Sequence, residues 1–101
     1  MAGPIKTAIT EMMGCEYPII AAPMFLVSNE AIVSAASNAG GMGAAPSLNW
    51  RTSEQFAEAI EKIRAATNKP YCINLIVNKS NLRADQDLEV IAAHKVPFVI
   101  T

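Results

Sequence analysis

The fold is decided by Pro18-Ile-Ile-Ala-Ala-Pro-Met24 and, one helix length later, by Asn38-Ala-Gly-Gly-Met-Gly-Ala-Ala-Pro46. Both stretches are short runs of small, apolar residues without polar alternation, which is typical of strands buried on both faces of a parallel sheet. The residues between the two runs are enough for one crossover helix. The sequence therefore predicts a parallel β/α protein, and such folds place their chemistry at the carboxyl ends of the strands.

The same alternation of strand and helix continues along the chain. Strands are predicted at residues 19–22, 42–45, 71–77 and 96–101. They recur about every 25 residues, which is the length of one β/α unit. Proline introduces three of the four strands, at a position where its missing N–H does little harm to the ladder.

Three helices are predicted between these strands. The first is capped by Ser28 or Asn29 and ends at Gly40. The second starts at Thr52-Ser-Glu-Gln55, a capping-box pattern, and the third follows a polar loop at residues 78–85. The residues expected on the buried faces are Ala31, Ile32, Ala35, Ala36 and Ala39 in the first helix, Phe56, Ile60 and Ile63 in the second, and Leu88, Ile91 and Ala92 in the third.

Two closures of this sheet are compatible with the pattern, an open doubly wound sheet and a barrel. A (β/α)₈ TIM barrel needs eight units and about 250 residues, so 101 residues would supply three units and a fourth strand. A free-standing copy would leave two apolar strand edges unpaired, which proteins normally avoid. We therefore expect residues 1–101 to be the N-terminal portion of a longer α/β protein.

Composition narrows the class of protein. Half of the residues are apolar and 17% are charged, which indicates a chain with a packed core. The formal net charge of −1 gives no electrostatic reason to expect nucleic acid or a membrane surface. There is no secretory signal, so a cytoplasmic location is expected. Cys15 and Cys72 have neither metal-binding nor redox spacing, and both are expected to be reduced thiols.

Candidate ligand-binding residues lie where the predicted strands end. Ala22, Pro23 and Met24 follow the first strand, and a polarizable methionine there could pack on a flat ring, although plain core packing is the alternative. Asn74 places an amide in an otherwise apolar strand, and such a group needs a partner from the neighbouring loop or from a polar ligand. Thr101 raises the same question at the end of the fourth strand.

Two other sequence features are explained by structural roles rather than by ligand binding or catalysis. Gly40-Gly-Met-Gly43 precedes a strand, whereas phosphate-binding loops follow one, so these glycines are expected to end a helix and let it pack closely on the sheet. His94 is near the end of the third predicted helix, where positive charge suits the helix dipole. We therefore do not expect His94 to act as a catalytic base.

Four motifs in order resemble the start of the nitronate monooxygenase family, formerly called 2-nitropropane dioxygenases. They are Glu16-Tyr-Pro-Ile-Ile-Ala-Ala-Pro-Met24, Ala36-Ser-Asn-Ala-Gly-Gly-Met-Gly43, Ile73-Asn-Leu-Ile-Val-Asn-Lys-Ser-Asn81 and Val96-Pro-Phe-Val-Ile-Thr101. The resemblance implies a (β/α)₈ barrel that binds FMN without covalent attachment. It also implies oxidation of alkyl nitronates, or of nitroalkanes, by O₂ to a carbonyl compound and nitrite.

The resemblance assigns roles to five residues. Ala22, Pro23 and Met24 would line the flavin, Asn74 would hydrogen-bond it, and Thr101 would lie close by. No metal site is implied. The family's catalytic histidine and its phosphate-binding loops come from later strands, beyond residue 101, so this stretch alone is expected to be inactive. A homo-oligomeric state remains open.

Three other functions stay in view. Flavin-dependent enoyl-acyl-carrier-protein reductases and NAD(P)H:quinone reductases share this barrel opening but reduce FMN with a nicotinamide cofactor, so rapid bleaching by NADH would favour them. Inosine monophosphate dehydrogenases also carry a Pro-Met strand end, but the Asn-Leu-Ile-Val setting of Asn74 argues against them. A non-catalytic half-barrel module would expose its sheet edges to a partner and hold no chromophore.

Overall fold

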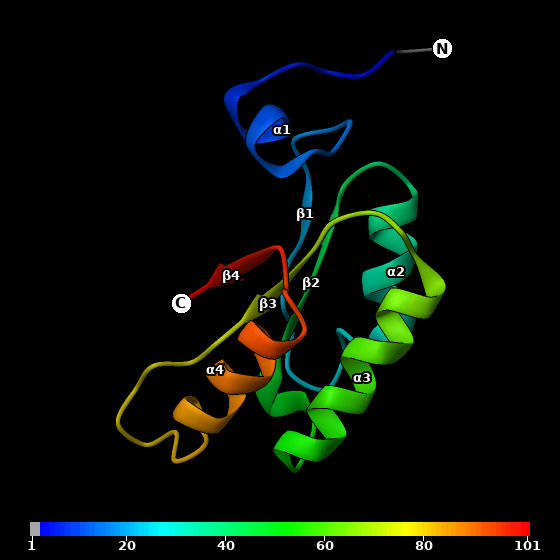
Figure 1. The fold of residues 1–101 in the computed structure, drawn as a ribbon. Coiled ribbons are helices and arrows are strands. Elements are labelled where there is room, and N and C mark those ends of the chain that lie inside the picture. Colours follow the sequence, from blue (N-terminus) through cyan, green and yellow to red (C-terminus); the bar gives the residue numbers. More distant parts are fainter. Residues whose placement is uncertain (1–2) are drawn as a thin grey trace.

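Four parallel strands form one sheet in the computed structural model, which describes residues 3–101 (Figure 1). The strands are β1 (Ile20–Ala21), β2 (Met42–Pro46), β3 (Tyr71–Asn74) and β4 (Phe98–Ile100). Their spatial order is β1-β2-β3-β4, the same as their order in the chain, and every pair is parallel. In an open doubly wound sheet, the strand order reverses, so that later strands are added on the other side of the first strand. In a barrel, each new strand is added beside the previous one. The order therefore favours the barrel.

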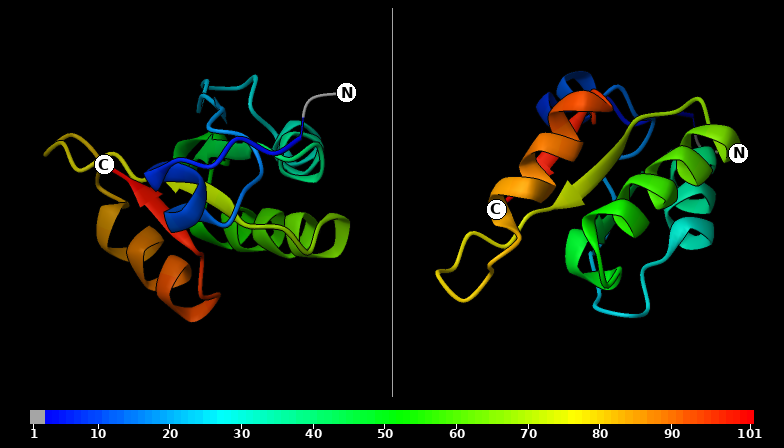
Figure 2. Two further views of the ribbon diagram at one scale, coloured as in Figure 1. Left: turned by 90° about the horizontal axis from the view of Figure 1, so that it is seen from above. Right: turned by 60° about the horizontal axis from the view of Figure 1, so that its bottom comes forward.

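Helices connect the strands and cover mainly one face of the sheet. They are α1 (Ala8–Met13), α2 (Glu30–Asn38), the 3₁₀ turn η1 (Ser47–Asn49), α3 (Ser53–Ala66) and α4 (Ala84–Ala93). The two views of Figure 2 show α2, α3 and α4 on one side of the sheet and α1 on the other. The three β/α units predicted from the sequence are confirmed, while α1 was not predicted. No helix within residues 3–101 is long and apolar enough to cross a membrane.

Alternation along the strands divides the apolar residues between two layers. On the side of α2, α3 and α4, which we call the helix face, the sheet contributes Ala45, Tyr71, Ile73 and Leu75 to the main core. On the opposite side, the inner face, Met42, Ala44 and Cys72 form a second cluster against Met13, Phe98 and Ile100. Because Met13 ends α1, this short helix covers the inner face near the amino ends of the strands.

Gly43 sets how closely α2 approaches β2. A Cβ at Gly43 would lie 2.6 Å from Cα of Val33 and would also overlap the Val33 backbone oxygen. The Gly43 N–H donates to Oγ of Ser37 at 3.1 Å. Val33 and Ser37 are one helical turn apart, so two successive turns of α2 contact this strand. The expectation that these glycines permit close packing is confirmed.

The same contact overturns the predicted buried face of α2. Val33, Ser34 and Ser37 are buried, while most of the alanines expected inside are exposed. Small polar residues face the sheet because the backbones touch there, which leaves no room for a longer side chain. Hydrophobic periodicity does not report such a contact.

The other two helices differ in how well the sequence describes them. Phe56, Ile60 and Ile63 of α3 are fully buried, as predicted. In α4, Leu88 is 50% exposed, contrary to prediction, and Asp87 is buried beside Ile91. Polar partners described below hold Asp87 inside. The helix α4 is therefore turned so that Asp87, rather than Leu88, faces the core.

The third strand is shorter than predicted. β3 ends at Asn74, and Val77 is 63% exposed. The ladder stops here because β2 ends at Pro46, the register partner of Asn74, and leaves no further strand residue to pair with. One more bond, from the Leu75 N–H to the Ile100 carbonyl at 2.8 Å, joins β3 to β4.

Gly43→Ala will destabilise the fold, because the added methyl group has no space against the Val33 backbone. We expect a loss of about 1–3 kcal/mol in the free energy of unfolding, measured by urea denaturation of the full-length protein. Gly3→Ala is the matched control, since a Cβ there meets nothing within 4 Å. An equal effect of both substitutions would contradict the close approach of α2 to β2.

Stability will also fall between pH 9 and pH 11 because of Cys72. Burial raises the pKa of this thiol from 9.0 to about 11, an effect that a backbone hydrogen bond from Ile100 partly offsets. The unfolded chain therefore loses the thiol proton first, and the contribution of Cys72, intact below pH 9, is lost as the pH approaches 11. Cys72→Ala should remove about 2 kcal/mol of this pH-dependent loss. If the free energy of unfolding fell equally with pH in the parent and in Cys72→Ala, the buried thiol would not be the cause.

Candidate functional site

The carboxyl ends of the strands meet at one edge of the sheet, which we call the rim. Register places Pro46, Asn74 and Ile100 side by side on β2, β3 and β4. β1 runs parallel to β2, so the residues that follow Ala21 extend to the same edge. Site residues predicted at the ends of three separate strands are thus brought to the same edge of the sheet.

Ala22, Pro23 and Met24 leave β1 at the rim and are accessible. Ala22 is exposed, Pro23 is half-buried, and Met24 is 47% exposed. None of them belongs to either apolar cluster within the described residues. Met24 therefore does not pack in the core that residues 3–101 form.

Asn74 is half-buried at the end of β3, and alternation directs it to the inner face beside Ile100. Within residues 3–101, its side-chain amide has no hydrogen-bond partner, and the neighbouring Asn81 amide donates instead to the Ile76 carbonyl at 2.7 Å. The nearby loop therefore does not satisfy Asn74. Thr101, one residue beyond β4, is exposed, and the alternation puts Ile100 rather than Thr101 on the Asn74 side.

The loop after β1 is fixed by residues that sequence reasoning missed. Ser28 is fully buried; its Oγ donates to the Ala22 carbonyl at 2.9 Å and accepts from the Met24 N–H at 2.8 Å. Asn49 of η1 accepts from the Leu26 N–H at 2.6 Å and donates to the Ser28 carbonyl. These bonds hold Leu26 in the left-handed region, at φ 64°. The apolar loop is therefore tied to the end of β2.

A sequence signal for Ser28 did exist. Ser28 and Asn29 were equal candidates to cap α2, and Asn29 performs this role by accepting from the Ile32 N–H at 3.1 Å. Because one cap is enough, the other polar side chain had to serve something else. The partner Asn49 is too distant in sequence to be inferred.

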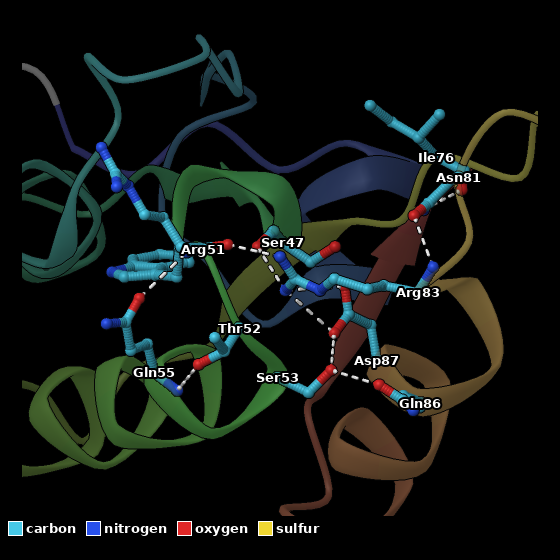
Figure 3. Close-up of polar contacts among 11 residues, drawn as sticks. Ser47, Arg51, Thr52, Ser53, Gln55, Ile76, Asn81, Arg83, Gln86 and Asp87 are labelled. Carbon is cyan, nitrogen blue, oxygen red and sulfur yellow. Dashed lines mark hydrogen bonds and ion pairs between the residues drawn. The ribbon is translucent and has the colours of Figure 1, made fainter.

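The segment from η1 to α3 is held in turn by Arg83, which precedes α4 (Figure 3). One Nη donates to the Trp50 carbonyl; the other lies 3.4 Å from the Ser47 carbonyl and 3.1 Å from Oδ1 of Asp87. Asp87 is 0% exposed and also accepts from Oγ of Ser53 at 2.8 Å. We call Ser28, Asn49, Ser53, Arg83 and Asp87 the rim network.

The start of α3 departs slightly from the predicted capping box. Oγ1 of Thr52 accepts from the Gln55 N–H at 3.1 Å, as expected. The Gln55 side chain accepts from the Arg51 N–H at 3.1 Å, one residue before the expected donor. Trp50 then stacks on Phe56, with ring centroids 5.8 Å apart, and anchors the loop to the core.

His94 lies at the opposite end of the strands. Its Nδ1 is 2.9 Å from the Val90 carbonyl, and its Nε2 is 3.1 Å from Oε1 of Glu61. Both ring nitrogens are engaged in holding the carboxyl end of α4. Within residues 3–101, no group of three or more acidic, histidine or cysteine side chains could hold a metal ion.

Comparison with known proteins places this arrangement. The sequence profile of the nitronate monooxygenase family matches residues 6–98, nearly the whole chain. The chain belongs to the nitronate monooxygenase family. Members of this family are flavoproteins, so the strand ends described above are those of a flavoprotein family. The resemblance inferred from the four motifs is confirmed.

Relatives of this nitronate monooxygenase family member include enzymes with different names. A nitronate monooxygenase of Pseudomonas aeruginosa is 37% identical over 69% of this chain and 20% of its own length. A (3aS,4S,5R,7aS)-5-hydroxy-7a-methyl-1-oxo-octahydro-1H-indene-4-carboxyl-CoA dehydrogenase of Mycobacterium tuberculosis is 38% identical over 70% of this chain and 20% of its own length. The chain thus spans about a fifth of these curated relatives.

A solved structure supports the barrel. The structure of FabK from Thermotoga maritima superimposes with a TM-score of 0.86 and 28% identity, over 94% of this chain and 30% of that chain. The four parallel strands and their helices therefore correspond to part of a TIM barrel, as predicted.

Asp87→Ala will destabilise the protein by about 3 kcal/mol, because it leaves the Arg83 guanidinium without its buried partner. Urea denaturation measures this loss, and Glu89→Ala on the exposed side of the same helix is the control, expected within about 0.5 kcal/mol of the parent. The double substitution Arg83→Met with Asp87→Leu should recover part of the loss. A loss no larger than that of Glu89→Ala would show that the ion pair does not hold the loops.

Proposed function

We propose that residues 1–101 form the N-terminal portion of a single FMN-binding TIM-barrel domain in a flavin-dependent oxidoreductase. The most specific form of this proposal is a nitronate monooxygenase that oxidises alkyl nitronates or nitroalkanes with O₂. Membership of the family and the accessible rim support it. We further propose that the protein is cytoplasmic.

The observation that carries the proposal is the Asn74 side chain at the rim. It is half-buried, it faces inward, and it has no protein partner within residues 3–101. Its amide is not among the buried polar atoms that lack a partner, so it is accessible to a ligand, and a flavin ring edge, which carries both donors and acceptors, would pair with it. The residues present therefore fit one side of a flavin.

The neighbouring residues fit the same group. Ala22 and Pro23 are small enough for a ring to approach the backbone, and Met24 offers a polarizable sulfur to a flat surface. Thr101 would lie close by, just past the end of β4. Ser28 and Asn49 would keep the Met24 loop in place, so that little ordering remains to be paid on binding.

The chemistry divides between the cofactor and the protein. When bound, FMN supplies the redox chemistry that converts the substrate to a carbonyl compound and nitrite. Residues 22–24 and Asn74 would bind and orient the ring and exclude water from one of its sides. The proton-abstracting or anion-stabilising base is proposed to be a histidine outside residues 1–101.

A second candidate is an FMN reductase driven by NAD(P)H. The equal identity to the mycobacterial dehydrogenase and the similarity to FabK favour keeping it. Anaerobic mixing of the full-length protein with propyl-2-nitronate or with NADH separates the two, because only the functional reductant bleaches the flavin rapidly. Nitrite release in air with nitronate supports the monooxygenase, whereas bleaching by NADH alone supports the reductase. A preparation that holds no flavin would contradict both and favour a non-catalytic module.

Asn74→Ala will weaken FMN binding about tenfold, the effect of one lost hydrogen bond to a buried polar ring. Flavin fluorescence titration of the apoprotein measures the dissociation constant. Asn78→Ala, which removes an amide four residues further along the chain, is the matched control and should leave FMN affinity unchanged. Equal affinities for the parent and Asn74→Ala would remove Asn74 from the flavin site.

A further inference from the structure

A hollow of about 350 Å³ lies at the amino ends of β3 and β4, at the opposite edge of the sheet from the rim. It opens between the carboxyl ends of α3 and α4. Four basic residues, Arg64, Lys69, His94 and Lys95, contribute to its wall. Nothing in the proposed flavin function uses this surface.

Tyr71 forms part of the same wall, and its hydroxyl lacks a partner that a ligand could supply. The residue is 5% exposed, and its hydroxyl is buried without a hydrogen-bond partner within the described residues. Burial raises the pKa of this phenol; Arg64 lowers it and Glu61 raises it, so both charged groups lie near the hydroxyl. The hydroxyl therefore keeps its proton and is available as a donor. A buried donor without an acceptor is unfavourable, and a small shift of the Tyr71 side chain would let an acceptor in the hollow relieve it.

Lys95 occupies a backbone position that usually belongs to glycine. It has φ 52°, and it follows α4 in a Schellman arrangement, with Lys95 N–H donating to Ala92 and Val96 N–H to Ile91, both at 3.2 Å. A lysine at this position is strained relative to glycine. Lys95 therefore places a charged side chain at the wall of the hollow, at a position where glycine would be less strained.

The charges at the hollow are mostly unpaired. Glu61 is engaged by His94, but Arg64, Lys69 and Lys95 form no ion pair within residues 3–101. Basic groups at helix carboxyl ends also favour the helix dipoles, which is the competing explanation. That explanation accounts for Arg64 and His94, but not for the buried Tyr71 hydroxyl.

We propose that this hollow binds a small anion that carries a phosphate group, with Tyr71 donating to a phosphate oxygen and Arg64, Lys69 and Lys95 supplying the positive charge. The volume accommodates a phosphate and a small substituent, and the three unpaired cations outweigh the nearby Glu61 carboxylate and favour an anion. The site is separate from the proposed flavin contact, because it lies at the other ends of the same strands.

The test is a calorimetric titration of inorganic phosphate into full-length protein saturated with FMN, at constant ionic strength set by chloride. Saturation with FMN fills the flavin phosphate site, so that any remaining phosphate binding is elsewhere. Tyr71→Phe and Lys95→Gln should each weaken phosphate binding about tenfold. Lys62→Gln, an exposed charge on α3 outside the hollow, should leave it unchanged. A parallel titration with glycerol 3-phosphate distinguishes the two sources of phosphate. Tighter binding of inorganic phosphate would indicate a free phosphate ligand, and tighter binding of glycerol 3-phosphate would indicate a phosphate monoester.

Lys95→Gly provides the sharpest readout, because its two effects have opposite signs. Relief of the left-handed strain should raise the melting temperature, while loss of the charge should weaken phosphate binding. Absence of phosphate binding by the parent protein, or unchanged affinity in both Tyr71→Phe and Lys95→Gln, would overturn the proposal and leave the basic residues as partners of the helix ends. Intact folding of Tyr71→Phe is verified by its retained FMN.

Discussion

The buried pair of Arg83 and Asp87 is the interaction on which the rim depends. Asp87 has no contact with solvent, and its carboxylate is tolerable there only because Arg83 and Ser53 satisfy it. The two Nη atoms of Arg83 also donate to carbonyls of the loop after β2, whereas its buried Nε has no partner within residues 3–101. Asn49 in that loop then holds the loop after β1. One ion pair within the third β/α unit is thus hydrogen-bonded to the second unit through Ser53 and the Trp50 carbonyl, and the second unit is bonded to the first through Asn49.

The register of the parallel sheet explains why a network at the rim matters for the candidate site. Because β2, β3 and β4 end level with one another, a single polar side chain at Asn74 and the chain leaving β1 at Met24 come to the same edge. The family profile covers almost the whole chain, while the curated relatives compared are several times longer. In our account, residues 1–101 shape one side of a flavin pocket, and the base and the phosphate-binding loops come from the remainder of the barrel. In this proposal, the stretch positions the flavin and does not supply the catalytic base.

Much of the fold could be predicted from local sequence. Short apolar runs after proline predicted the strands, and the pattern of Phe56, Ile60 and Ile63 predicted the buried face of α3. The failures share a cause, which is that contacts between distant residues overrode local periodicity. The rotation of α2 is set by a backbone contact with Gly43, and that of α4 by a charge whose partners Arg83 and Ser53 compensate its burial. Strand ends identified the candidate site residues, but not the loop contacts of Asn49, which lies 23 residues from its partner Leu26.

The most direct test of the account is a crystal structure of the full-length protein with FMN bound. We predict that the flavin ring lies at the carboxyl edge of the sheet, in van der Waals contact with Met24 and within hydrogen-bond distance of the Asn74 amide, with Ser28 and Asn49 bonded as described here. A flavin bound away from this edge, with Asn74 still unpartnered or paired to protein alone, would contradict the central claim.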